Sequence, residues 1–180
     1  MAEVKRRLLD RISDPSYLEA LPKRSVSELQ EMRNESSEAE NEVSFERRLC
    51  HARIDILTAE LDRRTGKHEG DLLSRLPEIL GKDVSTEPEG PLPSRAPDFS
   101  IPRNTDVPRR RVEEIVGEQT LARLPQVPTD EIKGIIESLA EHEKTLSERR
   151  RRIHDILDEI QAEIVRRYTE GGADPSEVLS

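Results

Sequence analysis

Residues 40–55 read ENEVSFERRLCHARID, and residues 143–158 read EKTLSERRRRIHDILD. Both stretches carry five polar residues at one spacing, E-x3-S-x2-R-x3-H-x3-D, and the second copy stands 103 positions after the first. A motif repeated at such a distance indicates a duplicated structural unit. The first copy consists of Glu40, Ser44, Arg47, His51 and Asp55, and the second consists of Glu143, Ser147, Arg150, His154 and Asp158.

The spacing places each set of five on one face of a helix. At about 100° per residue the positions cover about 80° of arc, and at about 1.5 Å per residue they extend over about 22 Å. Apolar residues of helical period accompany each polar stripe and predict two long amphipathic helices that share a narrow seam. The seam positions are Leu29, Met32, Ala39, Val43, Cys50, Ile54, Leu57 and Leu61 in the first helix, and Ile132, Ile135, Leu139, Leu146, Ile153, Ile156, Ile160 and Ile164 in the second.

The composition also favours long helices over a thick globular core. The chain has 180 residues, the length of one domain, of which 37% are charged, 2% are aromatic and 33% are apolar. So few apolar residues cannot easily offset chain entropy in a compact ball, whereas a seam between long helices needs fewer of them. We therefore expect an all-α protein, elongated, with disordered connections. The residues alone leave open whether the two long helices run parallel or antiparallel, because the long connector could span either arrangement.

Local signals divide the chain into segments. Two overlapping capping boxes, Ser25 with Glu28 and Ser27 with Gln30, mark the start of the first long helix, and Gly66 marks its end. Seven prolines between residues 67 and 108 forbid a continuous helix there. The expected segments are a short helix and lead-in at 1–24, the first long helix at 25–66, a Pro-rich and partly disordered connector at 67–108, a second short helix and lead-in at 109–128, the second long helix at 129–171, and a loose tail at 172–180.

Charge and apolar pattern narrow the classes of partner. A net charge of −9 argues against duplex DNA, which normally needs a broad basic face. The run Arg149–Arg152 is a local positive spot that suits a compact anionic ligand better than a long polyanion. The lone Cys50 fits a reducing compartment, and no apolar run approaches membrane-spanning length. We expect a cytoplasmic protein with no membrane partner.

The residue types of the two stripes suit a nucleotide. An arginine can hold a phosphate or the O6 and N7 edge of guanine, and a carboxylate can accept from the guanine N1–H and N2–H₂ edge. If the helices pack together, both stripes can border one groove. An enzyme is not expected, because no nucleophile elbow or phosphate loop is present. A metal site is not expected either, because the only signal is the pairing of His51 with Asp55 and of His154 with Asp158.

A solvated helix face is the alternative explanation for one such stripe. Comparison of the two copies argues against it. Seam positions have diverged, since Ser36 corresponds to Leu139 and Arg53 to Ile156, whereas all five polar positions match. A plain coiled coil depends on its seam more than on its outer face, so it would show the reverse.

The duplicated motif resembles that of the RsiG-type anti-sigma factors of actinobacteria, whose pattern is E-x3-S-x2-R-x3-Q-x3-D on both helices of an antiparallel coiled coil. The resemblance implies an antiparallel helical hairpin with short flanking helices that binds cyclic di-GMP as an intercalated dimer through all ten motif residues. It also implies that the loaded protein holds a WhiG-like, flagellar-type sigma factor away from RNA polymerase. His51 and His154 depart from the family's glutamine. The competing function is a coiled-coil scaffold or adaptor with no nucleotide ligand.

Overall fold

A computed structural model describes residues 9–14, 16–19, 21–66 and 110–170. Every regular element within these residues is helical, as the sequence predicts. The expected connector, the first eight residues and the tail lie outside the described residues. The elements are a helical stretch at 9–12, α2 (Ser16–Glu19), the 3-10 helix η1 (Leu21–Lys23), α3 (Val26–Arg64), α5 (Arg111–Ile115), α6 (Glu118–Ala122), the 3-10 helix η2 (Leu124–Gln126) and α7 (Thr129–Thr169).

Local capping sets both ends of α3. The backbone N–H of Ser25 donates to the Glu28 carboxylate at 2.8 Å, and the N–H of Glu28 donates to the Ser25 hydroxyl at 3.2 Å. This reciprocal pair is a capping box, and it satisfies N–H groups that have no partner within the helix. The second predicted box does not form the cap, because Ser27 already lies inside α3. At the other end Gly66 takes φ +71°, a left-handed conformation that glycine adopts without a Cβ penalty.

The chain divides into two compact units, and α3 and α7 each contribute one half to each unit. In unit 1, Arg33 of α3 lies 3.5 Å from Gln161 of α7, and Glu40 lies 3.0 Å from Arg150. As the residue number rises along α3, the number of the contacting residue on α7 falls. The halves of α3 and α7 in unit 1 are therefore antiparallel. Unit 1 comprises Met1–Ser44, Ser100–Val107 and Ser147–Ser180, and unit 2 comprises Phe45–Phe99 and Pro108–Leu146.

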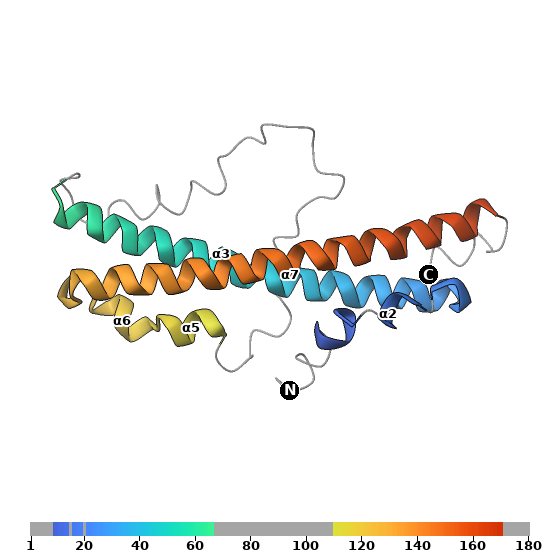
Figure 1. The fold of residues 1–180 in the computed structure, drawn as a ribbon, viewed down its shortest axis with the longest axis horizontal. Helices are drawn as coiled ribbons and strands as arrows, with labels where there is room; N and C mark the ends of the chain where they lie inside the picture. The colour runs from blue at the N-terminus through green and yellow to red at the C-terminus, as the bar shows by residue number, and fades with distance from the viewer. Residues whose placement is uncertain (1–8, 15, 20, 67–109, 171–180) are drawn as a thin grey trace. The chain divides into compact units, whose positions relative to one another are not determined.

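The helix halves of unit 2 are antiparallel as well. Glu46 lies 2.9 Å from His142, and Arg64 at the end of α3 lies 3.2 Å from Thr129 at the start of α7. The short helices α5 and α6 lie beside this pair (Figure 1). The expected antiparallel helical hairpin with short flanking helices is therefore confirmed, and the structure decides the orientation that the residues alone left open.

The apolar seam forms the core of each unit. Most of the predicted seam residues are buried, while Ile54, Leu61 and Ile135 are half-buried. Each fully buried leucine or isoleucine contributes about 1.5–3 kcal/mol of hydrophobic stabilisation. Ser36 and Cys50, which replace larger apolar residues of the second copy, are both completely buried. The first copy thus keeps the same seam with smaller side chains.

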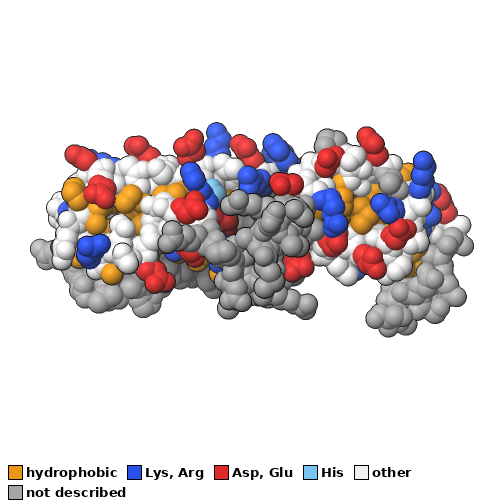
Figure 2. Space-filling model, turned by 90° about the horizontal axis from the view of Figure 1, so that it is seen from below, with side chains coloured by type: hydrophobic (Ala, Val, Ile, Leu, Met, Phe, Trp, Pro, Cys, Tyr) orange, Lys and Arg blue, Asp and Glu red, His pale blue; other side chains and the backbone are white. Residues whose placement is uncertain are grey.

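Acidic and basic side chains are interspersed over the face shown in Figure 2, with apolar side chains visible in areas between them. Within the described residues, none of the helices combines the length and the apolar character that crossing a membrane requires.

Candidate ligand-binding site

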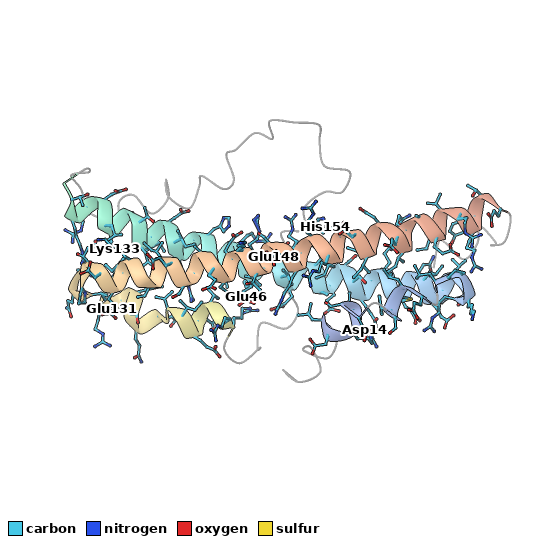
Figure 3. The ribbon with its side chains drawn as sticks, in the orientation of Figure 1. Asp14, Glu46, Glu131, Lys133, Glu148 and His154 are labelled. Atoms are coloured by element: carbon cyan, nitrogen blue, oxygen red, sulfur yellow. The ribbon has the colours of Figure 1, made fainter. Side chains whose placement is uncertain are left out.

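Four motif residues meet in unit 1, and we call them the first cluster: Glu40, Ser44, Arg150 and His154. Oε1 of Glu40 accepts hydrogen bonds from Ser44 Oγ at 2.6 Å and from Arg150 Nε at 3.0 Å. Nε2 of His154, which Figure 3 labels on α7, lies 3.1 Å from the same oxygen. One carboxylate of α3 therefore holds an arginine and a histidine of α7 across the seam.

The first cluster favours the ionised form of its carboxyl group. The Glu40 side chain is 17% exposed, and this burial by itself raises its pKa. Hydrogen bonds from Ser44, His154 and Arg150 outweigh the burial, so the pKa of Glu40 lies below its ordinary value. The carboxylate remains charged at neutral pH and remains an acceptor.

Three motif residues meet in unit 2, and we call them the second cluster: Glu143, Arg47 and His51. Oε1 of Glu143 lies 3.1 Å from Nε2 of His51 and 3.6 Å from Nη1 of Arg47. The Glu143 side chain is 23% exposed. Here a carboxylate of α7 holds an arginine and a histidine of α3.

Both clusters pair a glutamate with an arginine and a histidine, and the two motif copies exchange roles between them. In the first cluster, the glutamate of copy one meets the arginine and histidine of copy two. In the second cluster, the glutamate of copy two meets the arginine and histidine of copy one. The antiparallel packing of duplicated helices produces this exchange, and each cluster lies wholly within one unit. The structure therefore contains the combination of one glutamate acceptor, one arginine and one histidine twice.

The remaining motif residues are placed differently. Asp55 on α3 and Ser147 on α7 are half-buried, and Asp158 on α7 is exposed. Each of the three has interactions of its own. Seven of the ten predicted residues are therefore gathered into the two clusters, and these three are not joined to either glutamate by the contacts given above.

The RsiG-like family model matches residues 15–80 and 118–180, which is well over half of the chain. The chain belongs to the RsiG-like family. Both matched ranges contain one long helix and one copy of the motif. Membership of the RsiG-like family indicates an anti-sigma factor role, with a sigma factor as partner and a regulatory function. No curated protein matches the chain.

A second duplicated motif, E-x2-R-R, lies outside the polar stripes predicted from the sequence. Its first copy ends α3, where Glu60 is 1% exposed and accepts two hydrogen bonds from Arg63 and one from Arg64. Arg64 also donates to the backbone carbonyls of Leu124 at 2.8 Å and Val127 at 2.7 Å. These carbonyls belong to η2 and its C-cap, so Arg64 ties the end of α3 to the turn that leads into α7.

The second copy of E-x2-R-R ends α7 in the same way. Glu163 accepts two hydrogen bonds from Arg166 and one from Arg167, and Arg167 donates to the carbonyl of Pro22 in η1. The copies again stand 103 positions apart, which is the signal that could have revealed them. We call these two groups the arginine latches, because each one joins the end of one long helix to the entry of the other.

Two further residues hold α5 in unit 2. Arg53 donates to the carbonyls of Val112 at 2.7 Å and Val116 at 2.5 Å, and Glu46 accepts from the Val112 N–H at 3.4 Å. Glu46, which Figure 3 labels, also lies 2.9 Å from His142. Arg53 binds α5 instead of filling the seam, which accounts for its difference from Ile156, its counterpart in the second copy.

Within the described residues, there is no group of three or more His, Cys, Asp and Glu side chains that could hold a metal ion.

Proposed function

We propose that the chain is a cyclic di-GMP-dependent anti-sigma factor. The two clusters bind cyclic di-GMP as an intercalated dimer, and the loaded protein sequesters a WhiG-like sigma factor and keeps it from RNA polymerase. The observation that carries the proposal is the reciprocal pairing of the two motif copies, Glu40 with Arg150 and Glu143 with Arg47. A ligand built from equivalent halves suits a protein that repeats one set of donors and acceptors.

The chemistry of each cluster suits a guanine nucleotide. The carboxylate can accept from guanine N1–H and N2–H₂, and the arginine can bind a phosphate or the O6 and N7 edge. The arginine and histidine donors of the two clusters already face a carboxylate, so ligand binding is an exchange of partners. A phosphate replaces the glutamate as the acceptor for arginine, and the guanine edge replaces the arginine as the donor to glutamate. No charged group is left without a partner after this exchange.

Thermal unfolding with and without cyclic di-GMP tests the proposal. A ligand at 100 times its Kd adds about 2.7 kcal/mol to the free energy of unfolding, which corresponds to about 5–10 °C in Tm for a chain of this size. We expect a shift of this size with cyclic di-GMP and none with GMP at the same concentration. An unchanged Tm would contradict the proposal.

Substitution of the cluster arginines tests the site itself. Arg47→Ala and Arg150→Ala should each weaken cyclic di-GMP binding about ten- to a hundredfold, because each loses charge-assisted hydrogen bonds worth about 1.5–3 kcal/mol. Arg151→Ala is the matched control, because Arg151 is exposed and belongs to the same arginine run. Affinities that stay at the wild-type value in both cluster variants would remove the proposed roles.

A scaffold or adaptor with no nucleotide ligand is the competing function. The observation that favours it is that the charged groups of each cluster already form ion pairs between α3 and α7. Such ion pairs are a means by which a coiled coil fixes the register of its helices. On this alternative, cyclic di-GMP leaves Tm unchanged, and Arg150→Ala lowers Tm without any effect of the ligand.

A further inference from the structure

The arginine run of α7 is divided between two sides of the helix. Arg150 is half-buried and belongs to the first cluster, whereas Arg149, Arg151 and Arg152 are exposed. We call these three exposed residues the outer arginines. They lie in unit 1 together with the first cluster.

Within the described residues, the outer arginines form no hydrogen bond or ion pair, whereas each of the other arginines has a hydrogen bond, an ion pair or a ring contact. Elsewhere a guanidinium is typically bound to a carboxylate or a carbonyl, as in the arginine latches. Glu148 and Asp155 are one turn away from outer arginines on α7, yet neither forms an ion pair with them. Guanidinium groups without a carboxylate partner are ready receptors for anions.

Helical geometry directs the outer arginines away from the first cluster. At about 100° per residue, Arg149, Arg152 and Arg151 cover about 160° of arc, and Arg150 lies on the opposite side of α7. A ligand held by Arg150 therefore has its phosphates on a different flank from the outer arginines. The geometry favours a second, larger partner over additional contacts to the same ligand.

Two of the three outer arginines are not part of the duplication. The positions that correspond to them in copy one are Glu46, Arg48 and Leu49. Of these, Glu46 is used within the chain, where it binds His142 and the N–H of Val112. Arg149 and Arg152 are thus specific to copy two, whereas both copies share the ligand motif and the arginine at the position of Arg151.

We propose that the outer arginines form a docking surface for an acidic face of the sigma factor. This inference rests on the proposed function and adds to it the surface of α7 that contacts the partner. A protein fits better than a nucleic acid, because a chain with a net charge of −9 repels a long polyanion on either side of a patch this short. Charged groups at the rim of an interface mainly raise the association rate and select the partner.

The test is a triple variant, Arg149→Gln with Arg151→Gln and Arg152→Gln, assayed with purified WhiG-like sigma factor from the same genome at saturating cyclic di-GMP. We expect sigma factor binding to weaken about tenfold at low salt, mainly through slower association. The difference from wild type should shrink as salt is raised, because salt screens exposed charges. Affinity for cyclic di-GMP should stay at the wild-type value.

The control removes the same charge from unit 2 by Arg123→Gln, Lys133→Gln and Lys144→Gln, all exposed. Sigma factor binding should be unaffected by this control. Equal losses in both triple variants, or an unchanged affinity in the outer triple variant, overturns the docking surface while the proposed function stands. A loss of cyclic di-GMP affinity would assign the outer arginines to the ligand site, and a selective loss of duplex DNA binding would assign them to nucleic acid. Failure of the wild type to bind the sigma factor overturns the proposed function as well.

Discussion

Cys50 is a seam residue of α3 and is completely buried. Burial raises the pKa of its thiol to about 12, and the negative charges of Glu46 and Glu143 act in the same direction, while Arg53 opposes them. Because the thiolate is the reactive form, the folded chain should react with a thiol reagent at about pH 8 at least tenfold more slowly than the denatured chain. Cys50 is the only cysteine, so labelling followed by mass spectrometry reports on this site alone. Equal rates in both states would contradict the burial.

Single residues also show where sequence-based prediction stops. The motif fixes which side chains lie on one polar stripe, because helical period is a local property. It does not fix that Glu40 meets Arg150 and His154, because that contact depends on how two segments far apart in the sequence are aligned. Arg53 illustrates the same limit, since its carbonyl partners on α5 could not be read from a seam pattern.

Among the helices, α3 has local sequence signals at both of its ends. The capping box of Ser25 and Glu28 and the left-handed Gly66 stand within one turn of its ends. The choice between two overlapping capping boxes was not predictable from spacing alone, and Ser27 lies inside the helix. The same sequence pattern fits two starting points, and only the observed hydrogen bonds distinguish them.

The arginine latches predict an ordering of stabilities at the ends of the long helices. Arg64→Ala removes hydrogen bonds to Glu60, Leu124 and Val127, so we expect it to lower the free energy of unfolding by about 2–3 kcal/mol, or about 4–12 °C in Tm. Arg63→Ala is the matched control. It removes the bonds that a half-exposed side chain makes to Glu60, and it should cost about 1 kcal/mol or less.

The second latch should repeat this ordering. Arg167→Ala removes bonds to Glu163 and to the carbonyl of Pro22, whereas Arg166→Ala removes bonds to acidic side chains near the end of α7. Thermal unfolding of the four variants measures this ordering of stabilities directly. If Arg63→Ala and Arg166→Ala destabilise the chain as much as their neighbours do, the latches do not join helix ends as described.

For the molecule as a whole, the sequence predicted the helical class, the two long helices and their apolar seam. It could not predict that the chain divides into two compact units with one cluster in each. Antiparallel packing decides which motif residues share a unit, because it brings the first half of one copy against the second half of the other. From the residues alone the orientation was open, so the partition of the ten motif residues between two clusters was open as well.

Carboxylates in both units make the folded chain less stable as the pH falls. The pKa of Glu163 is lowered from 4.5 to about 2, chiefly by hydrogen bonds from Arg166 and then Arg167. The pKa of Glu60 is also lowered, chiefly by Arg63, and that of Glu40 lies below its ordinary value despite its burial. In each case the unfolded chain binds the proton more readily than the folded chain. The stabilisation is therefore complete above about pH 5 and is lost as the pH falls from about 4.5 toward about 2.

Thermal unfolding followed by helical circular dichroism should show this loss. We expect Tm to be steady between about pH 7 and about pH 5 and to fall steeply below about pH 4.5, because protonation breaks the hydrogen bonds that these carboxylates accept. Glu163→Gln is the matched variant: it removes the group with the most depressed pKa, so it should lower Tm at neutral pH and flatten the acid limb of the profile. A wild-type Tm that stays constant down to about pH 3, or a variant profile parallel to that of the wild type, would show that these carboxylates do not couple the helices to pH. Because the arginines that hold Glu163 are charged throughout this range, the change can be assigned to the carboxyl group.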